Sequence, residues 1–198
     1  MIHTIGDSHS KFPWEKIPGV KVHWLRAILA FTAGRDGLKR VNISNIGLKP
    51  NDSIIFCFGE IDCRGHIHKH LTKDNTYQKQ IDLIVKKYFD TIKLNKDLIK
   101  FNINICIFNV VPPYPQDKKK DGNNPEWPFV GTDNQRKSYV NYFNQKLKEY
   151  CLKNNYIFID VYNEYADNEG FLNIPLSDGN VHIGNPKYII DFINKHNL

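Results

Sequence analysis

Two short polar clusters, one near each end of this sequence, hold the side chains that nucleophilic catalysis needs. Gly6-Asp7-Ser8 follows an apolar run at the start of the chain, and LSDGNVHIGNP, which contains Asp178 and His182, lies near its end. A serine hydroxyl becomes a strong nucleophile when a histidine accepts its proton and a carboxylate orients that histidine. The chain supplies all three groups, provided that the fold brings its two ends together.

A third polar cluster, FCFGEIDCRGH, lies between the other two and supplies Gly59, Glu60, Asp62 and Arg64. Any one of these clusters alone fits an ordinary polar turn. However, Gly6-Asp7-Ser8 and FCFGEIDCRGH each end an apolar run with strand character. LSDGNVHIGNP precedes a helix-like segment. The agreement among the three positions is what favours a common site.

The elements around these clusters alternate between strands and helices. Short apolar runs predict the strands, and apolar residues at helical spacing predict the helices. This alternation is typical of a three-layer α/β domain around a parallel sheet. Ligands bind such folds at the edge formed by the carboxyl ends of the strands, so we expect the three clusters there. The expected strands are residues 1–5, 20–25, 53–58, 103–111 and 156–161, and the expected helices are residues 75–100, 133–154 and 185–196.

The composition is that of a globular protein, since 41% of the 198 residues are hydrophobic and 13% are aromatic. This length fits a single domain over residues 1–198. No apolar run reaches the roughly 18 residues of a membrane span, and no signal-peptide pattern precedes the first strand. These features predict a cytoplasmic protein without a membrane anchor.

The net charge of +6 raises the question of nucleic-acid binding. Lysine carries most of the excess, whereas the chain has only five arginines, the side chain that nucleic-acid recognition favours. We therefore expect a lysine-rich, solvated surface and no nucleic-acid partner.

The four cysteines match no disulfide framework and no paired zinc motif. Cys57, Cys106 and Cys151 lie in apolar patterns, which predicts free, buried thiols. No second ligand pair accompanies the one local cluster of zinc-type ligands, so a polar loop is favoured there over a metal site. That cluster, CRGHIHKHL, contains Cys63, His66, His68 and His70.

The order and placement of the polar clusters resemble the SGNH (GDSL-type) hydrolases over about residues 2–196. The resemblance rests on Gly6-Asp7-Ser8, on the glycine-led motif at Gly59, and on the pair Asp178 and His182. It implies a flavodoxin-like fold whose five-stranded parallel sheet has the order 2-1-3-4-5. It also implies that Ser8 is the nucleophile, His182 the general base and Asp178 its orienting partner, with no metal or organic cofactor.

Two motifs depart from the family pattern. The third motif usually reads Gly-x-Asn-Asp and its Asn helps to hold the oxyanion, but Ile61 stands at that place here. The string GEIDCRGH instead resembles a subgroup associated with polysaccharide-modifying enzymes. The second motif lacks its glycine, and the Asp–His spacing is four residues rather than three. The residues expected to bind the oxyanion or the substrate are Arg26, Ala27, Gly59, Asp62, Arg64 and His66.

A long loop, residues 112–133, leaves the same sheet edge and is long enough to be functional. It carries Tyr114, Trp127 and Phe129 beside Lys118–Lys120. Aromatic rings stack on sugar faces and lysines attract carboxylates or phosphates, which suggests a sugar substrate with an anionic part. Equally, these rings could simply cover the core.

Five further polar positions have simpler interpretations. His9 adjoins the nucleophile, but neighbouring side chains at a helix start point apart, which favours His182 as the base. His3 and His23 lie in strand patterns and are expected to form interstrand hydrogen bonds. Asp160 is expected to fix a loop. Arg136 opens a long helix, where it could face the cleft, although an ion pair on the helix surface is favoured.

The sequence thus predicts a serine esterase that removes a small acyl group, such as acetyl, from a carbohydrate. One alternative is a sugar O- or N-acyltransferase, which would resolve the same acyl-enzyme with a sugar hydroxyl or amine. Another is a glycan-binding protein on a catalytically decayed scaffold, for which the missing Asn argues. A nucleic-acid module rests on charge alone.

Overall fold

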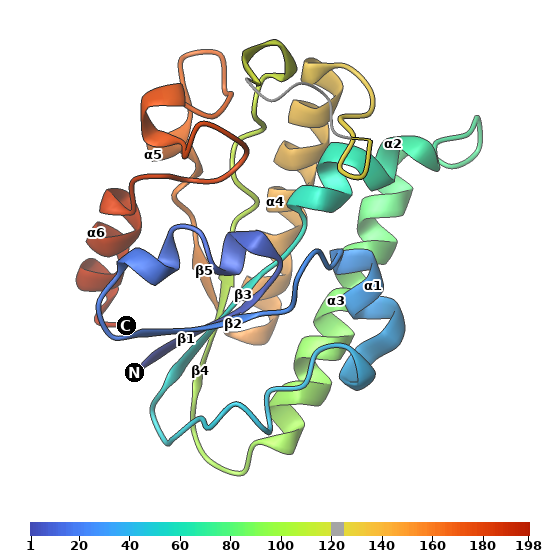
Figure 1. Ribbon diagram of the computed structural model, residues 1–198. Helices are drawn as coiled ribbons and strands as arrows, with labels where there is room; N and C mark the ends of the chain where they lie inside the picture. The colour runs from blue at the N-terminus through green and yellow to red at the C-terminus, as the bar shows by residue number, and fades with distance from the viewer. Residues whose placement is uncertain (120–124) are drawn as a thin grey trace.

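The fold is built on one parallel sheet with helices on both faces. The computed structural model describes residues 1–119 and 125–198. Five strands lie in the order β2-β1-β3-β4-β5, and every neighbouring pair is parallel (Figure 1). The strands are β1 (Ile2–Gly6), β2 (Val20–Trp24), β3 (Ser53–Cys57), β4 (Asn104–Phe108) and β5 (Ile157–Ile159).

Two long helices and several short ones connect the strands. The long helices begin at threonine caps, whose side chains accept hydrogen bonds from backbone N–H groups in the first turn. None of the helices in the described part of the chain is long and apolar enough to cross a membrane. The helices are α1 (Ala30–Asp36), α2 (Ile67–Lys69), α3 (Tyr77–Leu98), α4 (Asp133–Asn154), α5 (Tyr162–Tyr165) and α6 (Lys187–His196), with a π-helical turn at Asp62–His66.

The sheet separates two hydrophobic clusters, which gives the three layers. One cluster packs Ile54 and Phe56 of β3 against α1, α3 and α4. The other packs Ile55 and Cys57 of the same strand against α6 and the segments beside it. Because side chains alternate along β3 and all five of its residues are buried, this strand is covered on both faces.

The structure confirms the predicted fold class and strand order. All five predicted strands and all three predicted helices are present, and α4 has the predicted bounds. The four cysteines are free and buried, as expected. His3 and His23 also behave as predicted, with ring nitrogens 3.0 Å apart between β1 and β2.

One local expectation is wrong, and one helix is not predicted. No extended helix begins at Ser8, where a single 3-10 turn spans Ser8–Ser10. A longer helix there would need a backbone N–H from Pro13, which has none. The helix that the sequence does not predict is α1, which is short and has no long apolar pattern.

One glycine makes the nucleophile turn possible. Gly6 ends β1 with φ of 156°, and a Cβ atom at this position would lie 1.9 Å from the Cys57 carbonyl oxygen on β3. Only glycine lets the two backbones approach this closely. The next residue, Asp7, then donates its backbone N–H to that same oxygen at 3.2 Å. The chain thereby leaves the sheet sharply, directly before Ser8.

The packing of α4 onto the sheet gives a matched test of the core. Leu147 is fully buried and Leu152 on the same helix is 75% exposed. We expect Leu147→Ala to lower the free energy of unfolding by about 2–5 kcal/mol, because it leaves a cavity in a close-packed interior. Leu152→Ala should change it by less than about 0.5 kcal/mol. Urea unfolding of both variants measures the difference, and equal losses would contradict the described packing of α4.

Candidate active site

Ser8, His182 and Asp178 form a continuous hydrogen-bonded chain. The Ser8 Oγ atom lies 2.8 Å from His182 Nε2, and His182 Nδ1 lies 2.8 Å from Asp178 Oδ2. A carboxylate only accepts hydrogen bonds, so Nδ1 carries the proton and Nε2 is left to accept the Ser8 hydroxyl. This is the tautomer that a general base needs.

The segment that carries His182 is anchored on both sides of that residue. Val181 and Ile183 are buried in the same hydrophobic cluster as Ile189 of α6, whereas His182 turns toward Ser8. At the base of the segment, Gly184 approaches Ser177 so closely that a Cβ atom would lie 2.2 Å from the Ser177 carbonyl oxygen. Because Val181 and Ile183 point into the core, the His182 imidazole between them points out toward Ser8. The close approach of Gly184 to Ser177 holds the two ends of the segment together.

Asp178 is held in its ionised form. Burial alone would raise the pKa of Asp178, but the His182 ring and the backbone N–H groups of Asn180 and His182 hold that pKa below its usual value. An ionised Asp178 accepts the Nδ1 proton of His182 and thereby orients that ring.

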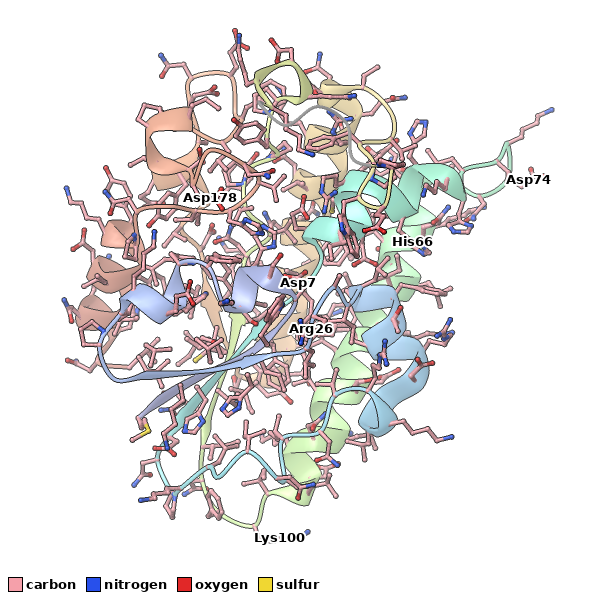
Figure 2. All side chains as sticks on the ribbon, in the orientation of Figure 1. Asp7, Arg26, His66, Asp74, Lys100 and Asp178 are labelled. Atoms are coloured by element: carbon pink, nitrogen blue, oxygen red, sulfur yellow. The ribbon has the colours of Figure 1, made fainter. Side chains whose placement is uncertain are left out.

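Ser8 and His182 line an open cleft of about 380 Å³ at the carboxyl edge of the sheet. Asp7 lies beyond the end of β1, and Asp178 lies on a loop at the same edge, although the two are far apart in sequence (Figure 2). A small ester has room to reach the serine here. The remaining lining residues are Trp24, Ala27, Ile61, Arg64, Lys119, Trp127, Phe129, Asn180 and Val181.

Two backbone N–H groups are available beside the serine. Neither the Ser8 N–H nor the Ala27 N–H donates to another residue in the described ranges. Arg26 has φ of 68°, a left-handed conformation that favours glycine, and this turn leads into Ala27 at the cleft. Ile61 also lines the cleft, so the position where the resemblance expects an amide side chain is apolar.

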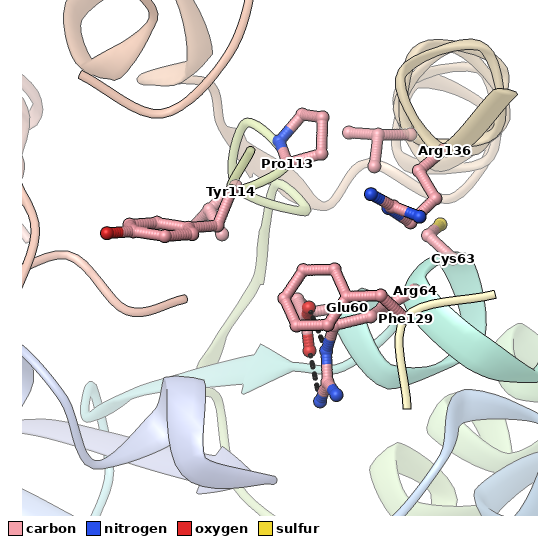
Figure 3. Close-up of a pocket in the computed structure, with 9 residues that line it drawn as sticks. Glu60, Cys63, Arg64, Pro113, Tyr114, Phe129 and Arg136 are labelled. Carbon is pink, nitrogen blue, oxygen red and sulfur yellow. Dashed lines mark hydrogen bonds and ion pairs between the residues drawn. The ribbon is translucent and has the colours of Figure 1, made fainter. Parts of the chain in front are cut away.

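Arg64 reaches the cleft, but its guanidinium is already paired. It donates to both carboxylate oxygens of Glu60, at 2.7 and 3.1 Å, and to the Trp127 carbonyl at 2.9 Å. Figure 3 shows this pair beside the Phe129 ring, in a small second pocket that shares Arg64 and Phe129 with the cleft. Arg136 also lines this pocket. Burial would raise the pKa of Glu60, yet Arg64 and two nearby histidines hold it below its usual value.

Three residues predicted to bind the oxyanion or substrate lie elsewhere. Asp62 is fully buried and accepts the N–H groups of Ala30 and Phe31, at 2.7 and 3.0 Å, so it caps α1. Burial raises the pKa of Asp62 to about 7. Gly59 occupies a tight turn with φ of 114°, and His66 packs between Phe31 and a neighbouring histidine outside the cleft. The prediction that these three residues line the cleft is therefore corrected.

The local zinc alternative finds no support in the geometry. Cys63 lies in the core, and His68 Nδ1 is hydrogen-bonded to the Tyr139 hydroxyl at 2.8 Å. Across residues 1–119 and 125–198, no three His, Cys, Asp or Glu side chains are grouped so that they could hold a metal ion.

Asp160 and Arg136 differ in part from their expected roles, since the contact found for Asp160 is an ion pair with a lysine and not a bond to loop backbone. Asp160 is exposed and lies 3.6 Å from Lys148, a weak ion pair at the end of β5. Arg136 pairs with Asp133 as predicted, but it is not on the surface. Its side chain is buried, donates to the Gly131 carbonyl at 2.6 Å and lies over the Phe129 ring.

The long loop contributes both aromatic and cationic groups to the cleft. Trp127, Phe129 and Lys119 line it, whereas Tyr114 is buried and donates its hydroxyl to the Lys118 and Gly179 carbonyl oxygens. Lys118 is paired with Asp117 at the surface. Lys120 lies outside the described residues.

Sequence reasoning missed two contributors to the cleft and one beneath it. Trp24 ends β2 at the ligand-binding edge, a position that the strand pattern alone would have flagged. Asn180 enters the cleft because it shares the segment of His182. The residue beneath the cleft is His9, which the sequence suggests only as a rival base. It is buried directly behind His182, and the two ring centroids are 4.8 Å apart.

Known structures share this architecture. No sequence-family model and no curated protein matches the chain. A GDSL-like lipase from Bacteroides thetaiotaomicron aligns with a TM-score of 0.64 at 12% identity, over 99% of this chain and 85% of that one. An acetylxylan esterase from Geobacillus stearothermophilus, crystallised as a catalytic mutant, aligns with a TM-score of 0.60 at 13% identity, over 100% and 94%. A lipase/acylhydrolase from Enterococcus faecalis gives 0.51 at 14% identity, over 98% and 94%. The chain has the fold of the GDSL-type hydrolases.

The ion pair between Glu60 and Arg64 should be structurally important. Both side chains are only 10% exposed, so Glu60→Gln leaves a largely buried guanidinium without its countercharge. We expect a loss of about 3–5 kcal/mol in the free energy of unfolding. The matched control is Asp90→Asn, which breaks the Lys86–Asp90 pair at the same i,i+4 spacing on the surface of α3 and should cost under about 1 kcal/mol. Similar losses in the two variants would show that burial does not matter here.

Proposed function

We propose that this protein is a serine esterase of the GDSL type that removes a small acyl group, such as acetyl, from a carbohydrate, with residues 1–198 acting as one domain. The observation that carries the proposal is the chain of 2.8 Å contacts from Ser8 through His182 to Asp178, which opens onto a cleft. The shared fold with GDSL-type lipases and acylhydrolases supports the same chemistry.

In the first half of the reaction, Ser8 Oγ attacks the ester carbonyl carbon while His182 Nε2 takes the hydroxyl proton. The carbonyl oxygen becomes an oxyanion, and the backbone N–H groups of Ser8 and Ala27, two residues that line the cleft, donate to it in this mechanism. Collapse of this intermediate breaks the ester bond, and His182 returns the proton to the departing alcohol oxygen. The acyl group remains on Ser8.

In the second half, water enters the cleft and gives a proton to His182 as it attacks the acyl carbon. The carboxylic acid leaves and Ser8 recovers its proton from His182. A sugar hydroxyl in place of water would make the enzyme an acyltransferase through the same intermediate. The apolar Ile61 removes one expected donor, and a lost oxyanion donor commonly costs about 2.7–4 kcal/mol of barrier stabilisation. Asn180 brings an amide side chain to the same cleft.

The cleft walls favour a sugar as the part of the substrate that carries the acyl group. Trp24 and Trp127 both line the cleft and are each 39% exposed, and Trp127 offers a ring face that can stack on a pyranose. The guanidinium of Arg26 and the ammonium of Lys11 each lie 4.9 Å from the Trp24 ring. Those cations, together with Lys119, suit a sugar that bears a carboxylate or phosphate. An acetylxylan esterase among the structures that share the fold is consistent with this substrate class.

Removal of the nucleophile tests the mechanism. With a small aryl acetate as substrate, Ser8→Ala should reduce kcat by at least about a thousand-fold, because no other group in the triad can form the acyl-enzyme. Ser138→Ala, an exposed serine on α4, is the control and should retain full activity. A fluorophosphonate probe should label wild type at Ser8 and leave Ser8→Ala unlabelled. An unlabelled, inactive wild type would favour the glycan-binding alternative.

The proposed sugar platform predicts a substrate-dependent effect. Trp127→Ala should raise KM for an acetylated oligosaccharide by about ten-fold, from the loss of one aromatic stacking contact, and leave KM for the aryl acetate within two-fold. Phe101→Ala, at an exposed aromatic residue remote from the cleft, should change neither value. Equal changes for both esters would argue against recognition of the sugar by this ring.

A further inference from the structure

His9 is buried between two oxygen acceptors that belong to different parts of the site. Its Nδ1 atom lies 3.1 Å from Asp7 Oδ1, in the nucleophile turn, and its Nε2 atom lies 3.2 Å from the Val181 carbonyl oxygen. The Asp7 carboxylate also accepts the His9 backbone N–H at 2.8 Å. His9 therefore connects the turn that presents Ser8 to the residue directly before His182.

The two acceptors determine the protonation state of this imidazole. A neutral imidazole carries one N–H, so one of its nitrogens would direct a lone pair at an oxygen lone pair. The imidazolium donates from both nitrogens and satisfies both contacts. The side chain is buried, so no solvent can replace a missing partner without rearrangement.

The charges around His9 agree with a cation. Asp7 faces it from the same turn, and Glu60 from the segment after β3, where Glu60 is itself paired with Arg64. His182 is the titratable group on the third side. Burial would lower the pKa of His9, but Asp7, Glu60 and the hydrogen bond to Val181 raise it above its usual value.

We propose that His9 is a positioning residue, held as an imidazolium, whose two hydrogen bonds fix the His182 segment at contact distance from Ser8. The kinetic consequence rests on the proposed esterase mechanism, whereas the charged state of His9 does not. Loss of its proton releases one of the two contacts. Because the turn and the segment are then joined by fewer bonds, the Ser8–His182 distance is no longer fixed.

This role has a defined pH dependence. The pKa of His9 is raised in the folded protein, so its contribution to stability is complete below the unfolded pKa of about 6.5 and is lost as pH rises through the folded value. The wild-type enzyme should therefore lose kcat at alkaline pH as His9 deprotonates. A residue that only fills space would produce no such limb.

Two near-isosteric variants separate the contacts. In His9→Gln the amide nitrogen can take the place of Nε2 and keep the bond to Val181, whereas in His9→Asn it can replace only Nδ1 and keep the bond to Asp7. We expect kcat to fall about 10-fold in His9→Gln and about 100-fold in His9→Asn, since small misplacements of a catalytic group cost this much. KM for the aryl acetate should be unchanged, and neither variant should show the alkaline limb. His196→Gln, on the exposed end of α6, is the control and should match wild type.

The protonation state is tested without any activity measurement. In ¹⁵N-labelled wild type at pH 7, His9 should show two protonated ring nitrogens, and His66, whose pKa burial lowers to about 4, should show one. A neutral His9 in this spectrum overturns the inference, as does an alkaline limb that persists in both variants. If Ser8→Ala retains esterase activity while His9 is doubly protonated, the esterase mechanism fails and the charged state of His9 remains established.

Discussion

The contact between Ser8 and His182 joins residues 174 positions apart, and the fold provides what this contact requires. β1 lies inside the sheet, between β2 and β3, so the turn after it opens at an interior position of the carboxyl edge. α6 packs on the face opposite α3 and α4, and the chain must cross that edge to reach it. A parallel sheet thus brings the head and the tail of the chain to one place, since all of its strands end on the same side.

A position at the edge is not sufficient, because catalysis needs the serine and the histidine to be held within about 0.5 Å of their productive geometry. The segment before α6 is held by buried Val181 and Ile183, by the Tyr114 hydroxyl on the Gly179 carbonyl, and by Lys16 on the Gly184 carbonyl at 2.6 Å. These contacts come from three separate parts of the chain. The precision of the site is therefore a property of tertiary packing around a loop, and His9 adds a contact from the nucleophile turn to the Val181 carbonyl, beside the contact of Ser8 with His182.

The sequence predicts most of the sheet, because β1, β3 and β4 are short apolar runs buried on both faces. It does not predict α1, whose first N–H groups are capped by Asp62 from a distant segment. The same long-range contact is the reason that the predicted place of Asp62 in the cleft is wrong. A carboxylate after a strand has the same appearance in sequence whether it caps a helix or faces a ligand. Arg136 shows the same limit, since its helix position suggested a surface and the fold buries it beside Phe129.

Two ion pairs lie behind the proposed triad. Asp7 faces His9, the proposed imidazolium, and Glu60 faces Arg64, so each of these two anions has a cationic partner. An unmatched anion this close would stabilise the His182 imidazolium in the resting enzyme and remove the free base, whereas an unmatched cation would oppose its formation during the reaction. With both pairs matched, Asp178 is the unmatched charge in direct contact with the ring. Asp178 is thereby the carboxylate that orients the His182 ring in the proposed mechanism.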